Sequence, residues 1–326
     1  MQNITGIKIR RLREDLGITQ EELANSIGLS HEFISLLELE KRDPSLENLS
    51  KLARFFGKNL AYFLSDKEDE FDILLRSKNK PDNFKKEIRS FKTYCKQYLA
   101  LEDKNEHALN LAPLYTNVTA SQMAEEERRR LGLGGNPCLN VFLLLEHNGL
   151  RILKKYISPE MNIAGIFVFL ERKQAAFALI NNLYSPEQQI LAAVHLYGHY
   201  LKDRHDGPVV DNSDIFIKEY SSLYPVREQF AQTFAANFLM PETKIKDLIK
   251  RLFYSANLNY ADILYIKHYF GVPLDVVLNR LFELGHLSRS EINKHKKKNS
   301  LNWEKTLYGR HDTKTSKKKT KEYSDR

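Results

Sequence analysis

A short stretch near the start of the chain limits its fold more than any other feature. In residues 18–24 (ITQEELA), Thr19 can cap a helix and Glu22, three residues later, completes a capping box. Gly28 follows, and glycine readily adopts the positive φ of a tight turn. Residues 30–38 (SHEFISLLE) then predict a second helix. The pattern therefore predicts two short helices joined by a tight turn.

The second of these helices has two different faces. Phe33, Ile34 and Leu37 can pack inward, whereas His31, Glu32 and Ser35 point outward. A helix that reads base edges in a major groove needs polar side chains on its first exposed turn. The pattern favours contact with nucleic acid.

Residues 19–56 resemble the XRE family of phage-repressor-like helix-turn-helix proteins. The features that they share with the family are the cap residues, the turn glycine, the core spacing and the PSLE start of the next helix. The resemblance implies a five-helix, all-α DNA-binding domain over residues 1–65 that binds operator DNA as a homodimer. It implies that Gln20 bonds a phosphate and that Ser30, His31, Glu32 and Ser35 face base edges. Plausible contacts to the DNA backbone are Arg10, Arg11, Lys41 and Arg42.

Two departures from the family pattern weaken specific readout of DNA sequence, and the alternative is a degenerate module used only for dimerisation. Leu36 and Leu39 stand where the family often has polar groups, and Glu40 replaces a common glycine. Residues 4–64 also carry nine basic and nine acidic side chains, so attraction to DNA would depend on local clusters of charge.

The net charge of +8 lies in the last forty residues, since residues 287–326 hold thirteen Lys or Arg and five Asp or Glu. We expect residues 292–326 to form a basic, disordered tail that either solubilises the chain or binds phosphates. The sequence shows no apolar run of membrane-spanning length, no signal-peptide core and no CxxC pair, which predicts a cytoplasmic protein with no membrane partner.

Charge and apolar spacing also predict how the rest of the chain is organised. Residues 66–119 are expected to be a linker that contains an amphipathic helix from Phe84 to about Leu101. Short apolar runs then predict strands, with a hairpin loop at 171–174. They are Val141–Leu145, Leu150–Leu153, Gly165–Leu170 and Ala175–Ile180. Helices are predicted from Ser185, with a capping box to Gln188, and at 227–239, 260–270 and 273–284.

His195 and His199 lie four residues apart on the helix that follows Ser185, so both imidazoles face one side and can hold a metal ion. Such a pair is weak evidence alone in a chain with 10 histidines. Glu228, on the next predicted helix, can supply a third ligand.

These residues, with the FAxxFAANFLMP and RLFELGHLS stretches, resemble the ImmA/IrrE family of zincin-type metallopeptidases. The resemblance covers about residues 120–285. It implies an α+β zincin-like domain at 120–250, a helical accessory segment at 251–291, and zinc bound by His195, His199 and Glu228. The fold class expected for the whole chain is mainly α with a small sheet.

The family has a glutamate directly after the first histidine, and this chain has Leu196. That glutamate is the general base, and losing one costs about 10²–10⁴ in rate. Three interpretations remain: a zinc site without efficient catalysis, a scaffold without metal, and an active peptidase. We expect a sequence-specific transcriptional regulator whose zincin-like domain binds a protein or small-molecule effector. The alternative is an active zinc metalloprotease that cleaves a repressor in a mobile-element or stress-response circuit.

Overall fold

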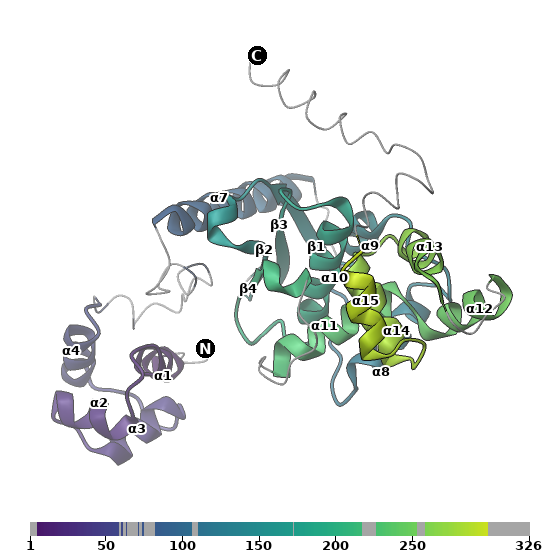
Figure 1. The fold of residues 1–326 in the computed structure, drawn as a ribbon. Helices are drawn as coiled ribbons and strands as arrows, with labels where there is room; N and C mark the ends of the chain where they lie inside the picture. Colours follow the sequence, from purple (N-terminus) through teal and green to yellow (C-terminus); the bar gives the residue numbers. More distant parts are fainter. Residues whose placement is uncertain are drawn as a thin grey trace. The chain divides into compact units, whose positions relative to one another are not determined.

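The computed structural model describes residues 5–58, 60, 63, 71, 74, 82–105, 110–171, 173–216, 226–252 and 258–298. The chain divides into two compact units, residues 1–76 and 77–326 (Figure 1). None of the described helices is both long and apolar enough to cross a membrane. The mainly α architecture with a small sheet confirms the fold class predicted from the sequence.

The first unit is all-α over its described residues. Thr19 and Glu22 form the predicted capping box, Gly28 ends the helix in the left-handed region at φ 68°, and the Ser30 hydroxyl accepts from the Phe33 amide. Its core includes Ile9, Leu23, Ile34 and Leu52. The helices are α1 (Thr5–Asp15), α2 (Gln20–Ile27), α3 (His31–Glu38) and α4 (Leu46–Phe55). The fifth helix expected before residue 65 lies mostly outside the described residues.

The second unit contains a mixed sheet, which comprises four strands over the described part of the chain in the order β1-β3-β2-β4. Strand β1 pairs with β3 in parallel, and β2 is antiparallel to both β3 and β4. The hairpin predicted at 171–174 joins β2 to β3. The strands are β1 (Leu150–Lys155), β2 (Ile163–Leu170), β3 (Ala175–Asn181) and β4 (Val209–Asn212).

Helices cover both faces of this sheet, which explains why every residue of β3 is buried. Alternate residues of β3, such as Ala176 and Ala178, enter the core that α10 (Pro186–Lys202) fills. On the opposite face Phe177 contacts Tyr98 of α7 (Asp82–Asn105), edge to face at 5.9 Å. Helix α7 is the amphipathic helix predicted within the linker, and its glutamates pair with Arg151 and Lys155 of β1.

The remaining helices pack around α10 and continue to the C-terminal end of the described chain. Helix α11 lies against α10 and α8 (Figure 1). The predicted helices at 227–239, 260–270 and 273–284 are confirmed as α11, α13 and α14. The helices are α8 (Ala120–Arg130), α9 (Val141–His147), α11 (Val226–Leu239), α12 (Glu242–Leu252), α13 (Tyr260–Phe270), α14 (Leu274–Glu283) and α15 (Arg289–Lys296), with short 3₁₀ turns at Pro159–Met161 and Ser213–Phe216.

Two predictions about these segments were wrong. The apolar run Val141–Leu145 belongs to helix α9, where Val141 and Leu145, one helical turn apart, are both buried. A short apolar run fits a buried helix as well as a strand, and residues i and i+4 share a face in both, so periodicity does not distinguish them. Residues 292–296 are also helical, since α15 has a capping box between Ser288 and Glu291 and buries Ile292. Residues 299–326 of the expected tail lie outside the described residues.

Candidate nucleic-acid interface and metal centre

The first turn of α3 presents polar side chains outward, as its sequence predicts. Ser30, His31 and Glu32 are exposed, Ser35 is half-buried, and Phe33, Ile34 and Leu37 are buried beneath them. The helix is held by its Ser30 cap and by the core below, so this turn is fixed in place. A capped helix with an exposed polar first turn has the form of a recognition helix.

An ion pair behind α3 joins the three helices of the motif. Arg13 of α1 donates two hydrogen bonds to Glu38 of α3, from Nε at 2.6 Å and from Nη2 at 2.9 Å. Gln20 of α2 donates to the same carboxylate at 2.8 Å. The Gln20 amide can donate a further hydrogen bond, so the phosphate contact expected of it stays a prediction.

The basic residues expected to contact the DNA backbone differ in how they are held. Arg42 and Lys41 are exposed just after α3, and the Arg42 guanidinium lies 4.8 Å from the centre of the Phe33 ring. Arg10 is exposed and pairs with Glu14 at 2.9 Å. Arg11 lies in α1, but its side chain is outside what the structure describes. Lys41 and Arg42 thus follow α3 closely in the chain, and α3 carries the exposed polar first turn.

The metal centre begins with α10, which has the predicted Ser185–Gln188 capping box and Pro186 in its first turn. His195 and His199 are both buried on this helix, and their Nε2 atoms lie 3.2 Å apart. A Cβ on Gly198 would lie 2.9 Å from the Phe234 ring and 3.4 Å from the Ala231 Cα. The glycine therefore permits the close approach of α10 and α11.

That approach brings Glu228, at the start of α11, to the two imidazoles. Its Oε2 lies 3.2 Å from His195 Nε2, and its Oε1 lies 3.6 Å from His199 Nε2. The three residues predicted as ligands therefore converge. Two imidazole nitrogens and a carboxylate are a donor set that suits zinc.

Hydrogen bonds behind the imidazoles orient them toward this centre. His195 Nδ1 lies 3.1 Å from Gln232 Oε1, and the Gln232 amide nitrogen donates to the Ile215 carbonyl, which fixes the amide's orientation. His199 Nδ1 lies 3.0 Å from Asp203 Oδ1, and Asp203 also accepts from Arg227 Nε at 2.6 Å. An Nδ1–H held in this way leaves Nε2 as the ligand atom, the usual support of a metal-binding histidine.

A fourth residue, Asp211 of β4, completes the cluster. Its ligand oxygen, the ligand nitrogens of His195 and His199 and the ligand oxygen of Glu228 all lie within 4.8 Å of one another. Asp211 Oδ1 is 3.5 Å from His195 Nε2. Asp211 is 2% exposed, and neither of its carboxylate oxygens accepts a hydrogen bond from a described residue. A buried carboxylate without donors is costly unless a cation compensates it.

The electrostatics of the cluster follow from burial and mutual contact. Burial raises the pKa of the Asp211 carboxyl, and the two histidines oppose that shift. Burial would lower the pKa of His199, but its hydrogen bonds to Asp203 and Glu228 raise it to about 9. Burial would raise the pKa of Glu228, but hydrogen bonds from both histidines hold that pKa well below its usual range. The carboxylates of the cluster therefore stabilise positive charge on or between the two imidazoles.

The residue after the first histidine, Leu196, lies in the apolar core. It is fully buried, and a Cβ on Gly165 of β2 would lie 2.9 Å from its Cδ1. Gly165 is the cross-strand partner of Asp211. Leu196 therefore packs over the strand position directly beside Asp211.

Sequence reasoning missed four members of this site. Asp203 follows His199 by four residues and Gln232 follows Glu228 by four, so helical spacing could have indicated both. Arg227 directly precedes Glu228 and reaches Asp203. Asp211 carries no such signal, because it reaches the centre only through the pairing of β4 with β2.

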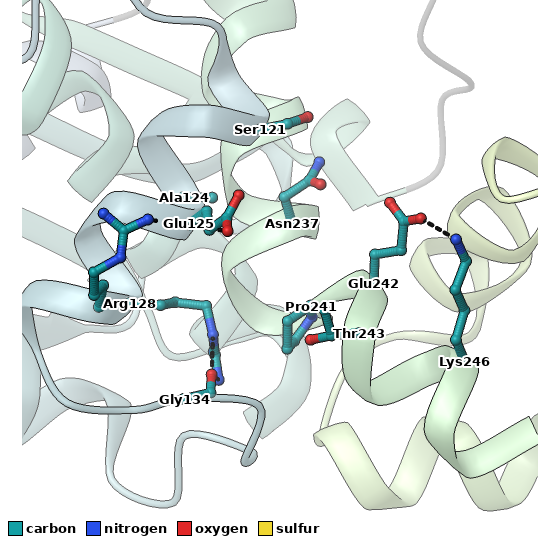
Figure 2. A pocket seen from close by; sticks show the side chains of 11 residues that line it. Ser121, Ala124, Glu125, Arg128, Gly134, Asn237, Pro241, Glu242, Thr243 and Lys246 are labelled. Carbon is teal, nitrogen blue, oxygen red and sulfur yellow. Dashed lines mark hydrogen bonds and ion pairs between the residues drawn. The ribbon is translucent and has the colours of Figure 1, made fainter.

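A separate hollow of about 440 Å³ lies between α8, the end of α11 and the start of α12 (Figure 2). Its charged side chains are already paired: Glu242 with Lys246, and Glu125 with Arg129. Arg128, at its base, donates to the carbonyl oxygen of Gly134 (Figure 2). It also donates to the carbonyl oxygen of Phe238. We assign no ligand to this hollow.

Two family models match the chain, one in each unit. A helix-turn-helix model matches residues 9–63, which contain α2 and α3. An IrrE N-terminal-like domain model matches residues 160–282, which contain His195, His199, Asp211 and Glu228.

Curated relatives match the first unit. The cryptic phage CTXphi transcriptional repressor RstR of Vibrio cholerae is 41% identical over 71 residues, 22% of this chain and 64% of the repressor. The HTH-type transcriptional regulator PuuR of Escherichia coli (strain K12) is 33% identical over 72 residues, 22% of this chain and 39% of PuuR. An uncharacterized HTH-type transcriptional regulator of Archaeoglobus fulgidus is 41% identical over 63 residues, 19% of this chain and 90% of that protein. The chain thus spans less than two thirds of the length of RstR and of PuuR.

Proposed function

The chain belongs to the helix-turn-helix family of transcriptional regulators, and on that basis we propose that residues 1–65 bind operator DNA as a homodimer. The observation that carries the proposal is the exposed polar first turn of α3 above a buried apolar face. Ser30, His31, Glu32 and Ser35 read base edges in the major groove. The phosphate contacts come from Gln20, Arg10, Arg11, Lys41 and Arg42. A chain with this role acts in the cytoplasm.

Selection of duplexes from a random library by the full chain tests this proposal. Wild-type protein should enrich one sequence motif, and replacing His31 and Glu32 by alanine should broaden it. Replacing Lys41 and Arg42 by alanine should weaken binding to all duplexes alike and flatten the dependence of log affinity on log salt. Recovery of no motif by the wild type would overturn sequence-specific readout by residues 1–65.

We further propose that the second unit binds zinc through His195, His199 and Glu228. The convergence of these three ligand atoms and the hydrogen bonds behind both imidazoles support this assignment. Zinc loading followed by dialysis should leave one ion per chain, and His199→Ala should lose it. Failure of the wild type to retain zinc would favour the scaffold without metal.

In this proposal the zincin-like domain is a sensor or interaction domain for a protein or small-molecule effector rather than a peptidase. Leu196 stands where the general base of the resembling peptidases lies, and leucine can neither accept nor deliver a proton. Leu196 is also buried against Gly165, so an apolar side chain occupies the position of the general base.

The second candidate function is an active zinc peptidase that cleaves a repressor protein. It is favoured by the intact His195–His199–Glu228 set. Incubating the zinc-loaded chain with candidate repressor proteins separates the two functions. Cleavage that His199→Ala abolishes would establish the peptidase, whereas intact repressors support the sensor.

A further inference from the structure

The environment of Asp211 extends the proposed metal site. Asp211 is the only cluster member supplied by the sheet, and it enters from β4, opposite the helices that carry the other three ligands. Its carboxylate is buried, and neither oxygen accepts a hydrogen bond from a described residue. The other three side chains have further polar partners or partial exposure. Of the four side chains in the cluster, the Asp211 carboxylate is therefore the one that a bound cation would stabilise most.

The distances from His195 Nε2 to the other ligand atoms are close to those of a tetrahedral centre. Atoms bound at about 2.0–2.2 Å to a tetrahedral zinc ion lie roughly 3.3–3.6 Å apart. The measured separations from His195 Nε2 are 3.2 Å to His199 Nε2, 3.2 Å to Glu228 Oε2 and 3.5 Å to Asp211 Oδ1. His199 Nε2 lies 3.6 Å from Glu228 Oε1. Asp211 Oδ1 thus lies from His195 Nε2 at the spacing expected between two zinc ligands, and the ligand atoms of the whole cluster lie within 4.8 Å of one another.

We infer that Asp211 is the fourth protein ligand of this metal site, which makes the site a closed His₂–carboxylate₂ centre. Catalytic zinc sites keep one position open for water, whereas sites with four protein ligands are structural. A closed centre joins α10, β4 and α11 through one ion. Four protein ligands would also leave no coordination position for a water that a general base could activate.

Leu196 is consistent with this arrangement. It packs over Gly165, and Gly165 pairs directly with Asp211 across β2 and β4. Directly opposed residues on antiparallel strands lie within about 4.5–5.5 Å of one another. A glutamate at position 196 would therefore place a second carboxylate beside Asp211 in the core, where like charges repel. Leucine at position 196 avoids this repulsion, so it is compatible with a buried aspartate at position 211.

This inference rests on the proposed metal site, and cobalt substitution tests it without an activity assay. The full chain is loaded with Co²⁺, and its visible absorption is recorded during titration with azide, a small anion that binds at open coordination positions. The variants are Asp211→Ala and the nearly isosteric Asp211→Asn. The matched control is Asp206→Ala, since Asp206 is exposed in the loop before β4.

We expect the wild type and Asp206→Ala to give the intense spectrum of a four-coordinate ion that azide does not change. Asp211→Ala and Asp211→Asn should bind Co²⁺ at least tenfold more weakly and should respond to azide. If Asp211→Ala fails to fold, Asp211→Asn provides the same readout.

An azide response in the wild type equal to that of the Asp211 variants would overturn the closed centre while leaving the three-ligand site intact. No Co²⁺ or Zn²⁺ binding by the wild type would overturn the three-ligand site and the role of Asp211 together. Neither result bears on DNA binding by the first unit, which is tested separately by selection of duplexes.

Discussion

Asp211 Oδ1 lies 3.5 Å from His195 Nε2, although the two residues come from different layers of the second unit. His195 is fixed by Gln232 behind it, and Asp211 is fixed by the pairing of β4 with β2. Because the strand partner of Asp211 is Gly165, and Leu196 packs over that glycine, the identity of residue 196 is linked to the charge of residue 211.

Restoring glutamate at position 196 is expected to damage the second unit rather than create a peptidase. Leu196→Glu buries a carboxylate in an apolar core beside Asp211, which costs several kcal/mol of unfolding free energy. Thermal unfolding of the full chain and peptide cleavage measure the two effects. Leu196→Met, the control, should change stability by less than about 1.5 kcal/mol. A folded Leu196→Glu protein that cleaves peptides at least a hundredfold faster than wild type would contradict the closed site.

The hydrogen bond from His199 to Asp203 should contribute to metal affinity. Asp203→Ala removes the acceptor that orients the His199 ring and leaves Arg227 without its carboxylate partner. We expect zinc affinity to fall about 10–100-fold, measured by competition with a coloured chelator. Asp203→Asn keeps an oxygen acceptor and should recover part of the loss. Equal affinities for wild type and Asp203→Ala would show that the ring is positioned without this contact.

The close contact of α10 with α11 at Gly198 should control whether Glu228 reaches the metal. Gly198→Ala would place a methyl group 2.9 Å from the buried Phe234 ring, so the helices must separate. We expect a loss of about 1–3 kcal/mol of stability and weaker zinc binding in the same variant. Gly271→Ala, at the end of α13, has no atom within 4 Å of its added Cβ, but its φ of +63° strains alanine, so it controls for backbone strain away from the helix contact. A Gly198→Ala protein with wild-type zinc affinity would contradict this account.

Local sequence signals predicted the helix caps and the His195–His199 pair, because each depends on spacing within one element, whereas Glu228 on the next helix was predicted from the family resemblance. The Thr19–Glu22 box, the Ser185–Gln188 box and the His195–His199 pair are of this kind. Asp211 could not be predicted, since only the β2–β4 pairing brings it to the histidines. The sequence predicts a strand at Val141–Leu145, where the structure has helix α9, because an apolar run of that length has no decisive period.

The protonation of His199 predicts how chelator-treated protein responds to pH. The folded-state pKa of His199 is raised to about 9 from an ordinary value near 6.5, so the folded protein binds the proton more tightly. The stability that this provides is complete below about pH 6.5 and is lost as the pH rises toward 9. The melting temperature of the second unit should therefore fall over this range. Zinc replaces the proton, so saturating zinc should largely remove the fall, and His199→Gln should remove it without metal.

The stability of the first unit should depend on the strained backbone conformation of Glu40. Glu40 follows α3 with φ 57°, in the left-handed region, where an L-residue other than glycine is disfavoured by about 1–2 kcal/mol. Glycine removes that strain but loses about 0.5–1 kcal/mol through its freer unfolded chain. Glu40→Gly should therefore stabilise the unit by about 0.5–1 kcal/mol, measured in the full chain as slower amide hydrogen exchange over residues 5–58. Glu40→Ala keeps the strain and should give no gain. Faster exchange in Glu40→Gly than in Glu40→Ala would show that the Glu40 side chain stabilises the turn more than its backbone strains it.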